Sequence, residues 1–152
     1  MNKAEVEALW RALCACTCKS PVNAPFDCVT VHDRVVYVTN CVVTHRVEGL
    51  YQPGSVFKAL FGRSIAYMDR ARIFDGILAY DPVSRDFSGT CPYYDSAYVA
   101  LALRPHKAVG SRNMRFYPGK GDSLAPLIIT STIATRRDPI VITTAVQGMR
   151  TA

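Results

Sequence analysis

Residues Ser123 to Ala152 read SLAPLIITSTIATRRDPIVITTAVQGMRTA, and this stretch says more about the fold than any other part of the chain. Two β-branched runs, Leu127 to Ser131 and Ile140 to Ala145, flank a polar turn around Arg136-Arg137-Asp138-Pro139. β-Branched residues favour extended backbone, and two such runs around a polar turn are typical of a hairpin. The sequence therefore predicts an antiparallel hairpin that ends just before Met149-Arg150.

The first half of the chain carries similar strand signals. Cys28 to His32 and Arg34 to Thr39 are β-branched runs around His32-Asp33, which predicts a tight hairpin. Cys41 to Val47 continues as a third strand before the Glu48-Gly49 turn. In the second half, basic and apolar residues alternate from Arg112 to Tyr117, which predicts another strand.

The middle of the chain is less regular. Val56 to Phe61 is a short apolar segment that fits either a helix or a strand. Asp75-Gly76 interrupts the apolar segment Arg72 to Tyr80 and favours a turn between two strands. Asp81 to Tyr94 is rich in Pro, Ser and Asp and is expected to be a loop.

Two helices are predicted, one near the start of each half. Asn2 and Glu5 have the spacing of a capping box, and apolar residues at helical spacing follow as far as Cys16. We therefore expect an amphipathic helix from Lys3 to Cys16. A second helix is expected to begin near Asp95 or Ser96, both favourable N-cap residues, and to end at Pro105.

The elements are thus ordered as a helix followed by strands, and then again as a helix followed by strands. This order predicts a single α+β domain over residues 1–152, with pseudo-repeat halves of about 1–80 and 95–152. Two helices are expected to pack on one side of antiparallel strands, because each element must bury its apolar face.

Composition limits the class of protein. The 152 residues are 49% hydrophobic and 20% charged, enough to form a buried core. No apolar run is long enough to span a bilayer, and the N-terminus lacks the basic-then-apolar pattern of a secretion signal. We therefore expect a cytoplasmic protein.

The net charge of +6 favours a polyanionic partner. One window in the second half carries five basic residues and no acidic residue, and it is the best candidate for phosphate contacts. An ordinary solvated basic surface is the alternative interpretation. The five residues are Arg104, Lys107, Arg112, Arg115 and Lys120.

Neither the cysteines nor the histidines form a motif of known chemistry. Cys14, Cys16 and Cys18 are spaced C-x-C-x-C, without the C-x-x-C spacing of structural zinc sites. On a helix, Cys14 and Cys18 would share one face and Cys16 would point away. We expect reduced, mainly buried thiols, with no metal ion and no cofactor.

An enzymatic interpretation would pair Cys41 as a nucleophile with His45 or with His32-Asp33 as a base. The sequence supplies no glycine elbow, no phosphate-binding loop and no metal-ligand spacing. It therefore favours a protein without catalytic activity.

Several segments resemble the sliding clamps of DNA polymerases. DSAYVALALRP (Asp95 to Pro105) is similar to the second helix of a clamp domain, and NMRFYPGKGDSLAPLIIT (Asn113 to Thr130) to the strands and turn that follow it. IVITTAVQGMR (Ile140 to Arg150) is similar to the closing strand and tail of bacterial-type clamps. In the first half, VTVHDRVVYVTN (Val29 to Asn40) and THRVEG (Thr44 to Gly49) resemble a hairpin and a Gly-His-Arg-Leu element.

The chain also departs from the family pattern. Gly148 stands where the clamp tail usually has a proline, and Asn40 or Val43 stands where an aspartate is expected. Clamps carry two or three such domains per chain, whereas the present 152 residues are sufficient for one.

The resemblance implies a DNA-clamp-like domain that acts as a polymerase processivity factor and catalyses nothing. Helices of a clamp face double-stranded DNA and contact phosphates without reading sequence. On this basis the DNA-binding residues are expected to be Lys3, Arg11, Arg104, Lys107 and Arg112.

Clamps also hold partner peptides in an apolar groove beside the C-terminal tail. The resemblance implies that the groove of this chain includes His45, Val47, Val146, Met149 and Arg150. The alternative interpretation is that Val146 and Met149 only complete the packing of the last strand.

A single domain cannot enclose a duplex, so the resemblance also implies head-to-tail self-association into a ring, with six copies if each domain forms one sixth. The expected contacts are sheet edges near Arg72 to Tyr80 and one strand of the C-terminal hairpin. The implied partners are a DNA polymerase and a clamp loader, in a viral or phage replication system within the host cytoplasm.

The alternative function is that of a clamp-fold binding module that forms no ring. Such a module would act as a monomeric DNA-binding processivity subunit, or as a decoy of a host clamp or its loader.

Overall fold

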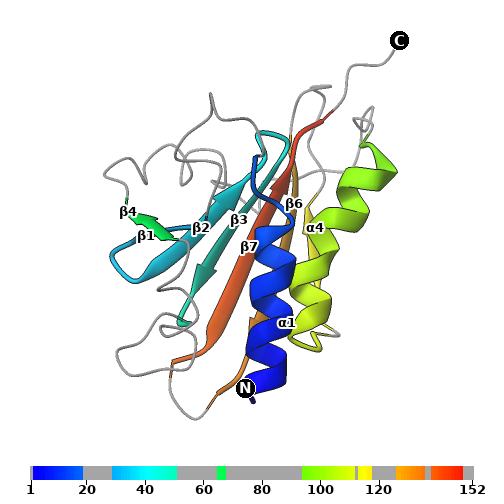
Figure 1. Ribbon diagram of the computed structural model, residues 1–152. Coiled ribbons are helices and arrows are strands. Elements are labelled where there is room, and N and C mark those ends of the chain that lie inside the picture. Colours follow the sequence, from blue (N-terminus) through cyan, green and yellow to red (C-terminus); the bar gives the residue numbers. More distant parts are fainter. Residues whose placement is uncertain are drawn as a thin grey trace.

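The computed structural model describes residues 2–18, 29–50, 65–67, 94–111, 113–117, 126–135 and 138–148 (Figure 1). Within these residues the chain forms two helices, α1 (Lys3–Cys14) and α4 (Ser96–Ala108). The strands are β1 (Val29–His32), β2 (Val35–Thr39), β3 (Val43–Glu48), β4 (Ile65–Tyr67), β5 (Arg115–Tyr117), β6 (Leu127–Ile133) and β7 (Ile140–Val146). The expected α+β class is confirmed.

The strands form one sheet with the order β4-β1-β2-β3-β7-β6-β5. All neighbours are antiparallel except β1 and β4, which are parallel. The meander β1-β2-β3 and the meander β5-β6-β7 meet at the antiparallel pair of β3 and β7, where Thr44 is opposite Ala145. Each half of the described chain therefore contains a helix followed by three antiparallel strands, mirrored about the β3–β7 pair, and the first half adds the parallel strand β4.

Helix α1 begins as the sequence predicts but ends earlier. The Asn2 side-chain oxygen accepts a hydrogen bond from the backbone amide of Glu5 at 2.9 Å. The Glu5 carboxylate in turn accepts one from the backbone amide of Asn2, also at 2.9 Å. This reciprocal pair is the expected capping box. The helix ends at Cys14, with Ala15 as its C-cap, because the amides of Cys16 and Thr17 bond to carbonyls three residues back. The helix is therefore two residues shorter than the predicted range of about Lys3 to Cys16.

Helix α4 continues through Pro105, where the sequence predicted its end. The Pro105 nitrogen cannot donate to the Leu101 carbonyl, which costs the helix one hydrogen bond. Two features offset this cost. The Pro105 ring is buried, and the next residue, His106, is hydrogen-bonded to Ser131 and Thr144 of the sheet. Tertiary contacts therefore maintain the last turn of α4.

The first hairpin is confirmed, with its turn one residue later than predicted. Strand β1 ends at His32 and β2 begins at Val35. Asp33 and Arg34, with φ of 46° and 66°, form the two-residue connection. Positive φ at both positions is typical of the type I′ turn that matches the twist of a hairpin.

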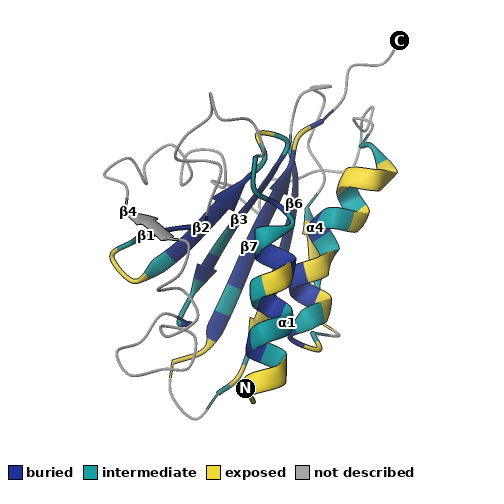
Figure 2. Cartoon of the chain, viewed as in Figure 1, coloured by how far each residue is buried: buried dark blue, intermediate teal, exposed yellow. Residues whose placement is uncertain are grey.

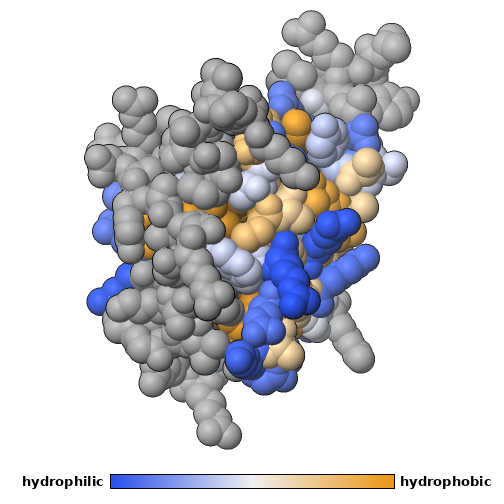
Figure 3. All heavy atoms as spheres, in the orientation of Figure 1, coloured by the Kyte–Doolittle hydropathy of each residue, from blue (hydrophilic) through white to orange (hydrophobic). Residues whose placement is uncertain are grey.

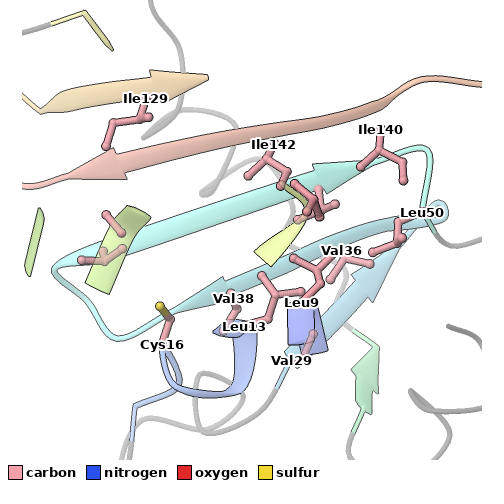
Figure 4. Packing of buried hydrophobic residues seen from close by; sticks show 14 of the residues in the cluster. Leu9, Leu13, Cys16, Val29, Val36, Val38, Leu50, Ile129, Ile140 and Ile142 are labelled. Atoms are coloured by element: carbon pink, nitrogen blue, oxygen red, sulfur yellow. The ribbon is translucent and has the colours of Figure 1, made fainter. Parts of the chain in front are cut away.

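Both helices lie on the same face of the sheet, where they contact each other, and α4 packs on β3 and β7 (Figure 1). Between the layers, Leu9 and Leu13 of α1 lie against Val36 and Val38 of β2, beside Ile142 of β7 (Figure 4). Each of these side chains is almost fully buried, and burial of one such side chain contributes about 1.5–3 kcal/mol to stability. This core fixes the positions of the two helices.

The opposite face of the sheet combines polar side chains with a small apolar cluster of Ile128 and Ala145, and it is also largely buried. The buried polar residues of this face include Thr30, Tyr37, Thr39, Thr44 and Thr143. The hydroxyls of Thr39 and Thr44 hydrogen-bond to each other at 2.9 Å. Threonine suits this face because a β-branched side chain fits a strand and a hydroxyl finds partners within the sheet.

The C-terminal hairpin occupies the middle of the sheet. Strand β7 lies between β3 and β6, and β6 lies between β7 and β5. The prediction that one strand of this hairpin forms an exposed edge was therefore wrong, because both strands have partners on both sides. The outer strands of the described sheet are β4 and β5. The predictions for Val56 to Phe61, Arg72 to Tyr80, and Asp81 to residue 93 concern segments outside the described residues.

Candidate nucleic-acid interface

The outer surface of the two helices carries four exposed cations: Lys3 and Arg11 on α1, and Arg104 and Lys107 on α4. On α1 the two residues are eight positions apart, and on α4 they are three positions apart. Either spacing brings two side chains to one side of a helix. In Figure 2 exposed residues mark the outer sides of both helices, and in Figure 3 hydrophilic side chains gather over them.

The charge of this helix surface is positive. The two helices together carry these four cations and only two carboxylates, those of Glu5 and Glu7. Helix α4 contains no acidic residue. The Glu5 carboxylate is occupied by the capping box of α1. A surface of this kind attracts a polyanion, and its long, flexible side chains contact phosphates without requiring a base sequence.

Three of the five residues of the basic window are described, and they lie on two elements, whereas Lys120, like Arg112, lies outside the described residues. Arg104 and Lys107 lie on α4, whereas Arg115 is exposed on the outer strand β5 beside Phe116. Phe116 is 47% exposed, the largest exposure of any large apolar side chain in the described part of the chain. Arg112 lies outside the described residues, so the described DNA-binding candidates are the four helix cations.

Three of the five residues expected to form a peptide groove are found inside the domain. His45, Val47 and Val146 are each 0% exposed and lie on the helix-facing side of β3 and β7. These three side chains therefore offer no surface to a peptide. For Val146 the structure agrees with the alternative interpretation, in which it completes the packing of the last strand. Met149 and Arg150 lie outside the described residues.

A chain of five buried side chains connects the turn after α1 and helix α4 to the sheet, and no motif in the sequence predicts it. We call this set the buried polar chain. Its contacts are Cys16 Sγ to His45 Nε2 at 3.1 Å, His45 Nδ1 to Thr144 Oγ1 at 2.6 Å, Thr144 Oγ1 to His106 Nε2 at 2.7 Å, and His106 Nδ1 to Ser131 Oγ at 2.7 Å.

All titratable members of the buried polar chain are held neutral. Burial, and secondarily the neighbouring His106, lowers the pKa of His45 to about 3. Burial lowers the pKa of His106 to about 4. Burial also raises the pKa of the Cys16 thiol to about 12, although the Arg104 charge acts in the opposite direction. A low-dielectric interior disfavours the charged form of each group.

With every group neutral, each hydrogen bond of the buried polar chain still has one donor and one acceptor. If the Cys16 thiol donates to His45, then His45 Nδ1–H donates to Thr144, the Thr144 hydroxyl donates to His106, and His106 Nδ1–H donates to Ser131. The reverse direction is equally complete, because thiols, hydroxyls and neutral imidazoles each donate once and also accept. Since Thr144 bonds both imidazoles, it links the Cys16 contact, in the turn after α1, to the His106 contacts of α4.

A pattern in the sequence signals this buried polar chain. His45 alternates with Val43 and Val47, and Thr144 alternates with Ile142 and Val146, so both occupy the apolar face of a strand. A polar residue at such a position must find a hydrogen-bond partner in the core. The pattern does not identify the partner, which requires the tertiary structure.

The possible catalytic pairs do not assemble. The partners of His45 are Cys16 and Thr144, not Cys41, and its side chain is buried. His32 contacts the exposed Asp33 at 3.2 Å on the β1–β2 turn. Within the described residues, no three His, Cys, Asp or Glu side chains are grouped to hold a metal ion. No described helix is both long and apolar enough to cross a membrane.

No protein-family model matches the chain, and no significant match was found among curated proteins or solved structures.

Proposed function

We propose that this chain is a sliding-clamp-like processivity factor, which binds duplex DNA without sequence preference and tethers a DNA polymerase to it. The main supporting observation is the helix layer, because it presents four exposed cations on one side of the described sheet. The mirrored helix-and-three-strand halves agree with the clamp pattern that the sequence resembles. The proposal assigns DNA contact to Lys3, Arg11, Arg104 and Lys107.

Such a surface suits sliding better than fixed binding. A protein that moves along DNA needs attraction to phosphates that changes little from one base pair to the next. Lysine and arginine on helices provide this attraction, since each forms weak, solvent-screened contacts. The buried polar chain and the apolar core hold α1 and α4 at a fixed separation, so the cations of both helices act as one surface.

A ring built from this 152-residue chain needs several copies. We propose head-to-tail association, in which an outer strand of one copy meets a different surface of the next. Strand β5 supports this assignment because it is an outer strand of the described sheet and exposes Arg115 and Phe116. Six copies would close the ring if each domain corresponds to one sixth of it.

Retention on circular DNA tests the proposal directly. Protein bound to a nicked circular plasmid is separated from unbound protein by gel filtration, and the plasmid is then cut once with a restriction enzyme. A sliding ring stays on the circle and is lost from the linear form, because only the linear form has ends. Native mass spectrometry of the same samples gives the number of copies.

Two outcomes would contradict a ring. Equal retention on circular and linear DNA by a monomer would identify the module that binds DNA without encircling it. Absence of DNA binding at low salt would refute the DNA-binding proposal itself and leave the clamp decoy, which would be tested next with a host clamp and its loader.

A further inference from the structure

Helix α4 is weakened by a proline just before its last turn and is then closed by a defined cap. Pro105 has no backbone N–H, so the helix lacks one hydrogen bond at that position. The helix ends in a Schellman motif, in which Gly110 has a φ of 68°. The Gly110 amide donates to the Lys107 carbonyl at 3.0 Å, and the Ser111 amide donates to the His106 carbonyl at 3.1 Å. The end of α4 is therefore a closed turn with a weakened connection to the turns before it.

His106 joins this end of α4 to the sheet. Its side chain is buried, with Nδ1 2.7 Å from Ser131 Oγ of β6 and Nε2 2.7 Å from Thr144 Oγ1 of β7. An imidazole that is hydrogen-bonded at both nitrogens to two different strands cannot turn or shift without losing a partner. A ring nitrogen without a partner is costly in the core, so the end of the helix has one favoured position.

The direction of the imidazole also sets the direction of two cations. Successive residues of an α-helix point about 100° apart around its axis. Because His106 points into the sheet, Arg104 and Lys107 point away from it, and both are exposed. Figure 2 shows exposed residues on this outer side of α4. Rotation of the end of α4 would therefore redirect both cations.

We propose that His106 is a positioning residue for DNA binding. Held by its two hydroxyl partners, it fixes the direction in which Arg104 and Lys107 meet phosphates. The inference rests on the proposed function, because that function assigns DNA contact to these two cations. It concerns α4 alone, so the cations of α1 should keep their DNA contacts when the position of His106 is disturbed.

The salt dependence of DNA binding shows whether these contacts are made. Each close contact between a cation and a phosphate releases a condensed counterion and adds about 0.9 to the slope of log K against log salt. An α4 whose end is displaced keeps its charge and still attracts DNA, but it makes fewer close contacts. A disturbed His106 should therefore lower the salt slope without abolishing binding.

The experiment measures this slope for the full chain by fluorescence anisotropy with a labelled duplex. Thr144→Val removes the hydroxyl that bonds His106 Nε2, and Ser131→Ala removes the hydroxyl that bonds Nδ1. Each variant should lower the slope by about 1–2, which corresponds to the two contacts of α4. Thr144→Ser retains the hydroxyl and should keep the slope of the unaltered chain.

Thr30→Val is the matched control for a general loss of stability. Thr30 is also buried, and its hydroxyl donates to the Tyr37 carbonyl at 3.2 Å on the opposite face of the sheet. This variant should be less stable than the unaltered chain but should keep its salt slope. Equal losses of slope in Thr30→Val and Thr144→Val would overturn the proposal, because they would reflect lower stability alone.

Combined variants identify the cations that His106 positions. In the Thr144→Val background, replacing Arg104 and Lys107 by Gln should lower the slope no further, because their contacts are already lost. Replacing Lys3 and Arg11 by Gln in the same background should lower it by about 2. The proposal is overturned if the α4 replacements lower the slope in this background as much as they do in the unaltered chain.

Amide hydrogen exchange without DNA, followed by NMR, separates this inference from the proposed function. The Gly110 and Ser111 amides should exchange faster in Ser131→Ala but not in Thr30→Val, because they close the end of α4. Unchanged exchange in Ser131→Ala would overturn the positioning role.

The DNA-binding result distinguishes the remaining outcomes. If the unaltered chain binds no DNA, the proposed function fails and the positioning role fails with it. If the unaltered chain binds DNA and Ser131→Ala keeps its salt slope, only the positioning role is overturned. Ser131→Ala gives this answer even if Thr144→Val does not fold.

Discussion

At the scale of single residues, the buried polar chain depends on keeping two imidazoles neutral in the core. The pKa values of His45 and His106 are about 3 and about 4, below the ordinary value of 6.5. A depressed folded-state pKa means that unfolded chains take up protons first as pH falls. The stabilising contribution is therefore complete above pH 6.5 and is lost progressively between pH 6.5 and pH 3.

This dependence can be measured by urea unfolding between pH 7.5 and pH 5, above the range in which most carboxylates titrate. We expect stability to fall by about 1.4 kcal/mol per pH unit for each histidine well below pH 6.5. His106→Gln should remove about half of the slope, because glutamine does not titrate. His32→Gln, at the half-buried end of β1, is the control and should keep the slope. A flat profile in the unaltered chain would contradict the neutral, buried assignment.

Two glycines with positive φ provide a second test at the residue scale. Gly49 has a φ of 80°, and a Cβ added there would overlap the Pro139 carbonyl oxygen. Gly110 has a φ of 68°, and an added Cβ would meet nothing within 4 Å. Gly110→Ala should therefore cost only the backbone strain of about 1–2 kcal/mol.

Gly49→Ala carries the same backbone strain together with a steric clash, and we expect a loss of about 3 kcal/mol or more. Thermal unfolding of both variants compares the two costs directly. Equal losses would show that the turn after β3 and the residues before β7 do not approach as closely as the structure indicates.

At the scale of elements, α1 and α4 are expected to bind DNA together. Each phosphate contact that releases a counterion adds about 0.9 to the slope of log K against log salt. Replacing Lys3, Arg11, Arg104 and Lys107 by Gln should reduce this slope by about 2–4 and weaken binding at least tenfold at low salt. Fluorescence anisotropy with a labelled duplex measures both quantities.

The control for the helix variant is Arg34→Gln, which removes an exposed cation from the β1–β2 turn. A change at Arg34 should leave the salt slope unaltered if the helices form the interface. The assignment fails if the four-residue helix variant binds DNA as the unaltered chain does, or if Arg34→Gln alone accounts for the loss. Circular dichroism of each variant checks that the fold is retained.

At the scale of the whole molecule, strand order determines which strand is available for self-association. The C-terminal hairpin is interior, and β5 is an outer strand with the exposed Phe116. Phe116→Asp should therefore shift the oligomer to monomer in native mass spectrometry, because a buried carboxylate without a partner disfavours an interface. Tyr98→Asp is the matched control, since Tyr98 is also exposed, at 37%, but lies on α4. Assembly that is unchanged by Phe116→Asp would exclude this side of β5 as the contact.

Local patterns in the sequence were sufficient to predict several of the helices and strands. The capping box at Asn2 and Glu5, the two hairpins and the α+β class all depend on residues a few positions apart, and all three are confirmed. The helix cations also follow from local spacing, because helical periodicity places Lys3 and Arg11 opposite the apolar face.

Only the tertiary structure decided how these elements combine. His45 bonds Thr144 across 99 positions of the chain, and this contact exists because β7 inserts between β3 and β6. The same packing maintains α4 beyond Pro105 and buries His45, Val47 and Val146, which were expected in a surface groove. Periodicity records which face of an element is apolar, but it does not record which other element will cover that face. That choice depends on burial over the whole chain, which no local window of sequence contains.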